Sequence, residues 1–258
     1  MSDSSQGPGW WQASDGKWYP PEQAPGYQQP APGGPYGSPY GGAGGDASGA
    51  TDVGTTLSYA WNKFIQNIGE WILLWLIAVG ISLVVRFILA AVGFGSAVSG
   101  IGGGSFSLVG AALSIVGTLV SGVLLVILAK AAAQAVNGSR IDIGAAFQLT
   151  GNNISAGLIF GLILGVLGLI PCVGPFLQWL SFLLLGFVPV LSALDDKGTE
   201  ALSESVSLST GRPGEAMVFW LIGGLIAFCC FFLGAPIAMI GGAYLVKRYR
   251  GESVAPAA

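Results

Sequence analysis

The sequence predicts an all-α fold, a polytopic bundle of membrane-spanning helices that follows a polar N-terminal tail. Two observations predict it. Hydrophobic residues make up 52% of the 258 residues and charged residues only 9%, whereas about 25% of an average soluble domain is charged. The apolar residues also gather in long blocks, and about 20 of them in a helix cross a bilayer. This composition excludes an ordinary soluble enzyme.

The tail occupies residues 1–55 and is rich in Pro, Gly and Tyr, with eight of the fourteen prolines of the chain. Such a segment buries too little apolar surface to offset the entropy lost on ordering. It is predicted to be disordered, with some polyproline II character. A Trp-rich motif lies within it at residues 9–20.

Four apolar blocks follow within the predicted helical domain, residues 56–250. The third block, 156–194, would be about 58 Å long as one helix, almost twice the roughly 30 Å hydrocarbon core. It must bend, and the Pro-containing stretch 171–175 predicts where. The fourth block carries a similar Gly-Ala-Pro break at 234–236. The six predicted spans are about 71–94, 107–129, 156–172, 174–194, 216–233 and 234–248.

Basic residues indicate the topology, because cytoplasmic loops carry the excess of Lys and Arg. The loop at 95–106 and the two proline turns carry no charge, whereas the other connections and the C-terminal end are basic. Six spans with both termini in the cytoplasm satisfy this pattern, in the plasma membrane of a bacterium. The alternative is four full spans with re-entrant shorter pieces. The basic residues concerned are Lys63, Lys130, Arg140, Lys197, Arg212, Lys247, Arg248 and Arg250.

Three amphipathic stretches precede the helical hairpins, at 57–65, 143–149 and 201–206. In the first, Leu57, Trp61, Phe64 and Ile65 share one face of a helix. These stretches are predicted to be interfacial helices at the cytoplasmic surface; the alternative is that they are ordinary polar linkers.

Two resemblances add expectations. Residues 9–20, with their Gly-Trp, Asp-Gly and Lys-Trp-Tyr pieces, resemble the short Trp-rich domain of unknown function found at the ends of many actinobacterial membrane proteins. Residues 60–64, the proline-broken hairpins and 242–252 are similar to the bacterial six-helix family that includes the membrane domain of some glycerophosphodiester phosphodiesterases. The phosphodiesterase barrel is absent, so this resemblance transfers no catalytic residue. Proline- and glycine-rich polytopic membrane proteins of actinobacteria share the same layout.

No catalytic, cofactor or metal site is predicted. The chain has no histidine, which removes the commonest general base and metal ligand. None of the acidic residues lies well inside a predicted span, and the three cysteines have no acidic partner there. The net charge of −3 argues against a nucleic-acid partner. The chain is therefore predicted not to be an enzyme.

Arg86 is the one charge well inside a predicted span, about seven residues from its outer end. A charge in that position is a functional hypothesis by default, for an anionic lipid headgroup or an acidic partner. The alternative is that its side chain snorkels to the interface or pairs structurally. A row of glycines at Gly157, Gly161 and Gly165 predicts close helix packing, within the bundle or between copies in a homo-oligomer.

Two further groups are candidates for contacts. Lys247, Arg248 and Arg250 form a basic group at the membrane edge, either a topology anchor or a contact for anionic lipid. In the tail, Trp10, Trp11, Trp18 and Tyr19 are candidates for binding a cytoplasmic protein partner; the alternative is a passive tail.

Three function hypotheses follow. The first is a non-enzymatic membrane scaffold or adaptor, in which residues 1–50 recruit cytoplasmic partners and the bundle anchors them in the lipid bilayer. The second is a transporter or channel for a small or lipid-like substrate, because broken helices often line binding sites. The third, an accessory membrane domain for lipid metabolism, is implied only by the resemblance.

Overall fold

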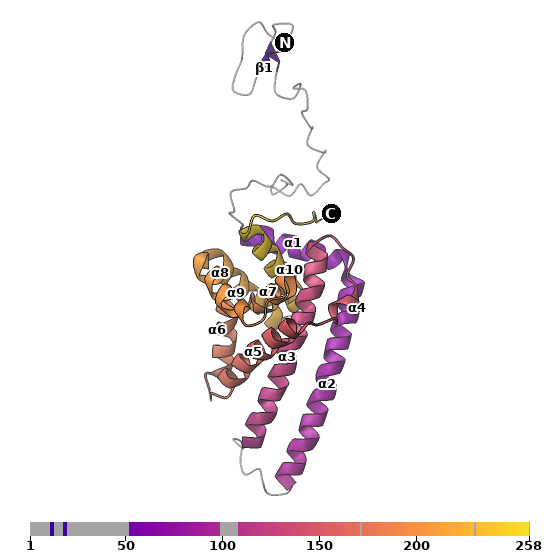
Figure 1. Cartoon of the computed structure of the whole chain (residues 1–258), viewed down its shortest axis with the longest axis vertical. Coiled ribbons are helices and arrows are strands. Elements are labelled where there is room, and N and C mark those ends of the chain that lie inside the picture. The colour runs from indigo at the N-terminus through magenta and orange to yellow at the C-terminus, as the bar shows by residue number, and fades with distance from the viewer. Residues whose placement is uncertain are drawn as a thin grey trace. The chain divides into compact units, whose positions relative to one another are not determined.

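The computed structural model describes residues 11–12, 18–19, 52–98, 108–170, 172–229 and 231–257 (Figure 1). The chain divides into two compact units, Met1–Ala43 and Gly44–Ala258. Apart from one pair of short strands in the first unit, every regular element described is a helix. The predicted helical class is therefore confirmed.

In the first unit, strand β1 (Trp11–Gln12) pairs with strand β2 (Trp18–Tyr19) in antiparallel register. Trp11 lies opposite Tyr19, and Gln12 lies opposite Trp18. This pairing differs from the disorder predicted for the tail, because Trp and Tyr are strong strand formers. The rest of the tail prediction, and Trp10, lie outside the described residues.

The second unit begins with helix α1 (Val53–Gln66), so the helical region starts three residues before the predicted boundary. The Asp52 side chain caps it by accepting a hydrogen bond from the Thr55 amide. Of the predicted apolar face, Phe64 is buried, whereas Trp61 and Ile65 are exposed. Helix α1 therefore has two apolar sides, one against the protein and one facing outward.

Helices α2 (Ile68–Val98) and α3 (Leu108–Val136) form the longest hairpin, with 31 and 29 residues. The two run side by side, and their outer halves extend beyond the other helices (Figure 1). Burial divides α3 in the same way, because most of its residues from Leu124 to Val136 are buried, whereas those before it are mostly half-buried or exposed.

A short turn of helix, α4 (Ile143–Ala146), leads to α5 (Gly151–Gly168), where Thr150 and Asn153 form a capping box. The bend predicted at 171–175 separates α5 from α6 (Gly174–Leu185), and Cys172 lies there with a left-handed φ of 65°. The predicted span 174–194 corresponds to a stretch long and apolar enough to cross a membrane, Phe176–Asp195, but it contains two helices, because α7 (Val188–Asp195) follows after a break at Gly186. The indole of Trp220 lies against Gly186, where any side chain would collide with it.

Helix α8 (Glu200–Gly211) matches the third amphipathic stretch and is followed by α9 (Pro213–Cys229) and α10 (Phe231–Tyr249). The break predicted at 234–236 is wrong. Helix α10 runs through these positions from Phe231, and Pro236 lies inside it. A proline inside a helix removes one hydrogen bond and bends the helix, and neighbouring helices in a membrane protein can tolerate that loss.

The core of the second unit joins α1, the inner half of α3, α5, α7, α9 and α10. Its largest fully buried side chains include Trp71, Phe160, Phe187 and Phe219. By length and composition, four stretches of the described helices could cross a membrane: Ile68–Ala91, Gly110–Val136, Gly151–Gly168 and Phe176–Asp195. Residues Pro213–Ile226 form a shorter apolar helix.

Candidate functional site

Apart from Arg86, the charged residues described in the second unit gather at the end where α2 begins and α3 ends. The strongest group there is an ion-pair network of Asp195, Lys197, Glu204 and Arg250. The Arg250 guanidinium donates to both carboxylate oxygens of Asp195, at 3.0 and 2.6 Å, and to Glu204 Oε1 at 2.6 Å. Lys197 Nζ donates to Glu204 and lies 3.3 Å from Asp195 Oδ2. The network thus ties the ends of α7 and α10 to α8.

The network shifts the pKa values of its members. Burial alone would raise the pKa of Glu204, but the hydrogen bonds from Lys197 and Arg250 outweigh it and hold that pKa below its usual range. The hydrogen bond to Glu204 likewise raises the pKa of Lys197. Each group therefore stays charged at neutral pH, and the network is a fixed set of charges.

A second polar cluster joins α3, α5 and α7 at the same end. The buried Asn153 amide donates to the Ser192 carbonyl and hydroxyl, at 2.8 and 3.1 Å. The Lys130 ammonium donates to Asn153 Oδ1 at 3.2 Å and to the Gln148 carbonyl. The Thr150 hydroxyl donates to Asp196. These bonds pair the polar groups with each other, so the cluster fastens the three helices together.

The C-terminal segment folds back over this end. The Tyr59 hydroxyl donates to the Ala255 carbonyl at 2.9 Å, and the Ala255 amide donates to the Val136 carbonyl at 2.9 Å. Residues 252–257 are thereby held between α1 and the end of α3. Helix α1 begins at this same end, with Asp52 as its N-cap.

The predicted basic edge is partly neutralised by acidic partners. Arg250 belongs to the ion-pair network, and Lys247 Nζ lies 3.9 Å from Glu252 Oε2. Arg248 is half-buried, and its Nε has no hydrogen-bond partner among the described residues. The three residues therefore do not form a free basic surface.

The predicted glycine row lies against α3. A Cβ on Gly157 would come within 2.8 Å of Val123 Cα, and one on Gly161 within 2.3 Å of the Thr118 carbonyl oxygen. A Cβ on Gly165 would likewise come within 2.4 Å of Thr118 Oγ1. Because no side chain intervenes, the backbones of α3 and α5 approach closely within one chain.

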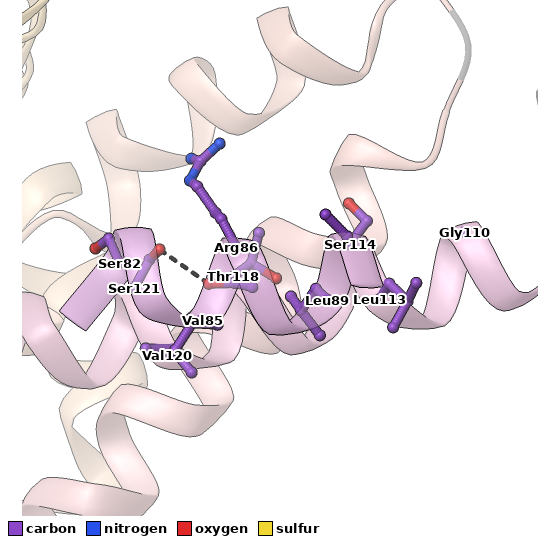
Figure 2. A pocket seen from close by; sticks show the side chains of 12 residues that line it. Ser82, Val85, Arg86, Leu89, Gly110, Leu113, Ser114, Thr118, Val120 and Ser121 are labelled. Carbon is purple, nitrogen blue, oxygen red and sulfur yellow. Dashed lines mark hydrogen bonds between the residues drawn. The ribbon is translucent and has the colours of Figure 1, made fainter. Parts of the chain in front are cut away.

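Arg86 lies at a groove between the outer halves of α2 and α3, with a volume of about 450 Å³ (Figure 2). Its lining is mostly apolar and includes Val85, Leu89 and Leu113, with several Ser and Thr residues. Figure 2 shows the Arg86 side chain rising from α2, with its guanidinium apart from the other labelled side chains. The Ser82, Thr118 and Ser121 hydroxyls donate to carbonyls of their own helices, so Arg86 supplies the charge of the groove.

Helix α2 continues to Val98, but its stretch that is long and apolar enough to cross a membrane is Ile68–Ala91. Arg86 lies five residues, or about 8 Å by helical rise, from the outer end of that stretch. Trp11, Trp18 and Tyr19 lie on the paired strands of the first unit, and the structure describes only their backbone.

The described residues contain no group of three or more His, Cys, Asp or Glu side chains placed to hold a metal ion. The sequence analysis did not single out Asp195 or Glu204, and it used Lys197 only to indicate the topology. The adjacent charges Asp195, Asp196 and Lys197 are the one local signal that could have indicated them.

Comparisons with protein-family models, curated proteins and solved structures gave no match. The fold and the arrangement of charges are therefore the basis for any statement on function. The four long apolar helices define the class, a helical protein suited to multiple passes through a membrane.

Proposed function

We propose that this chain is a non-enzymatic, multi-pass protein of a bacterial plasma membrane, and that it acts as a scaffold whose cytoplasmic tail recruits protein partners. The resemblance of its Trp-rich motif and its layout to actinobacterial membrane proteins supports the setting. Six crossings are proposed, made by α2, α3, α5, the α6–α7 pair, α9 and α10.

One observation carries the topology. Of the ten Lys and Arg residues, eight lie at the end of the second unit that also carries the ion-pair network; the others are Lys17 in the tail and Arg86. Contacts place them there: Arg140 pairs with Glu70 at 2.8 Å, and the Arg212 guanidinium lies 4.7 Å from the Tyr249 ring centroid. A cytoplasmic face is the one that gathers such charges. Helix α1 begins at this end, and the C-terminal segment lies there as well.

The interior of the bundle favours a scaffold over a channel. Large apolar side chains fill it, with Phe187 packed edge to face on Trp220 at 5.3 Å between ring centroids. Phe219 stacks in the same manner on Trp220, also at 5.3 Å. The first contact joins the N-cap of α7 to α9, and the second lies within α9. Packed aromatic contacts suit an anchor, whereas a transport route needs polar groups along its path.

The test compares protein partners captured from intact cells after crosslinking, with the full chain and with residues 1–50 deleted. A second variant, Trp11→Ala with Trp18→Ala, changes the Trp-rich motif alone, and Tyr36→Ala is its matched control in the tail. A scaffold loses the same partners in the deletion and in the double Trp variant but keeps them in Tyr36→Ala. Identical partners in all four proteins would contradict the scaffold and favour the transporter alternative.

A further inference from the structure

The groove between α2 and α3 is the feature that the scaffold function leaves unused. It lies on the outer halves of the two longest helices, away from the packed core. Its walls are aliphatic, from Val85 and Leu89 on α2 and from Leu113 and Val120 on α3. Gly117 has no side chain, which leaves space in the groove. A Cβ placed on it would have Leu89 Cδ1, at 3.9 Å, as its nearest atom.

Arg86 differs from four other basic residues of the second unit, because it has no acidic partner among the described residues. Arg250, Lys197, Lys247 and Arg140 each have an acidic partner within 4 Å. Arg86 is exposed and, among the described residues, makes neither an ion pair nor a hydrogen bond. Within the second unit it is therefore a cation with its hydrogen-bonding groups directed away from the protein.

The surroundings of Arg86 make an unpaired charge costly. It lies about 18 residues, or about 27 Å by helical rise, from Ile68 at the charged end of α2, which is near the outer edge of a hydrocarbon core about 30 Å thick. The surrounding residues of α2 are apolar and exposed, including Val84 at 60% and Phe87 at 77%. A charged side chain flanked by such a surface is expensive in hydrocarbon unless an anion meets it. The anion must come from outside the described chain.

We propose that the groove binds an anionic phospholipid, with the lipid phosphate on the Arg86 guanidinium and an acyl chain between α2 and α3. Charge complementarity selects the phosphate, because a guanidinium donates in a fork that matches phosphate oxygens. The aliphatic walls and a volume of about 450 Å³ suit a hydrocarbon chain. This site rests on the chain spanning a membrane, as in the proposed function, but not on the tail or its partners.

The test is native mass spectrometry of the full-length protein in detergent, titrated with phosphatidylglycerol, which is anionic, or phosphatidylcholine, which is zwitterionic. The first bound phosphatidylglycerol is expected to bind about fivefold more tightly than phosphatidylcholine, the preference that one basic side chain supplies near an anionic lipid. Arg86→Gln should abolish this preference, and Arg86→Lys should retain part of it. Arg140→Gln, another exposed arginine, is the matched control and should leave it unchanged.

A second variant tests the groove apart from the charge. Ser114 is exposed on α3 at the groove, so Ser114→Leu fills it while leaving Arg86 and the packed core intact. Ser114→Leu should weaken the binding of phosphatidylglycerol and of phosphatidylcholine by a similar factor. An equal preference in the wild type and Arg86→Gln would overturn the proposal, as would unchanged lipid binding in Ser114→Leu. Competition by soluble glycerol phosphate as strong as that by the lipid would overturn the lipid as occupant.

Discussion

Helices α2 and α5 both pack on α3, yet they do so in opposite ways. Helix α5 meets the backbone of α3 through its glycine row, and its buried face carries Phe160 and Leu164. Helix α2 keeps large side chains exposed along its length, among them Leu76 and Leu83 at 54% and 61%. Similar apolar composition thus serves packing in one helix and an outward surface in the other.

The difference teaches which feature of an apolar helix decides its place. Removing side chains along one face allows close backbone contact, which drives helix association in a membrane where apolar surface alone does not. The ion pairs at the charged end of the second unit differ between the two sides in the same way. Helix α2 has the single pair Glu70–Arg140, whereas α7, α8 and α10 share the ion-pair network. The α5 side is therefore expected to carry most of the stability.

The largest predicted effect breaks the close contact of α5. In Gly161→Ala the new Cβ would lie 2.3 Å from the Thr118 carbonyl oxygen and 2.8 Å from Leu119 Cα, both backbone atoms. We expect the free energy of unfolding to fall by about 3 kcal/mol, the upper part of the range for overpacking. Gly80→Ala in α2 is the control, since no atom lies within 4 Å of its Cβ. Unfolding in detergent by SDS titration measures both, and equal effects would refute the comparison.

A smaller effect is expected from the charged end. Arg250→Gln removes one of the two cations that Asp195 and Glu204 share and leaves Lys197, and it should lower the free energy of unfolding by about 1–2 kcal/mol. The matched variant, Arg140→Gln, removes a partner whose side chain is 88% exposed, and it should cost less than about 1 kcal/mol. The same SDS titration compares them. A larger loss in Arg140→Gln would mean that α2 is fastened more tightly than α7, α8 and α10.

The smallest effect is a dependence on pH. The pKa of Glu204 is lowered in the folded protein, so its stabilising contribution is complete above its unfolded value and is lost as the pH falls through the folded one. We expect the stability of the wild type to change little from pH 7 to about pH 5 and to decrease below about pH 4. Glu204→Gln should show a shallower decrease. Parallel curves for the two proteins would remove Glu204 as a contributor.

Local features of the sequence predicted a large part of the fold. Apolar block length indicated the helices, and the proline stretch at 171–175 indicated the bend between α5 and α6. The break at 234–236 was predicted wrongly, because a proline such as Pro236 is a strong local signal, whereas tertiary packing decides whether the helix ends there. The separation of α6 from α7 depends on Trp220 lying against Gly186, a contact between distant segments.

The candidate sites were predictable to different degrees. Arg86 was evident because a single charge interrupts an apolar block. The ion-pair network was not, since Arg250 is 55 residues from Asp195 and 46 from Glu204 along the chain. The lipid groove needs both α2 and α3 in register, and no local pattern fixes that register.

The most direct test of the account concerns the proposed six crossings. With Cys229 and Cys230 replaced by Ala, Cys172 is left as the one thiol, and it is exposed at the turn between α5 and α6. Single cysteines at Ser99 and at Ser203 in α8, in a chain that also lacks Cys172, report on the opposite faces. An impermeant maleimide applied to intact cells should label Cys172 and Ser99→Cys, and label Ser203→Cys only after the cells are permeabilised. Labelling of Cys172 only after permeabilisation would contradict six crossings and make the α5–α6 hairpin re-entrant.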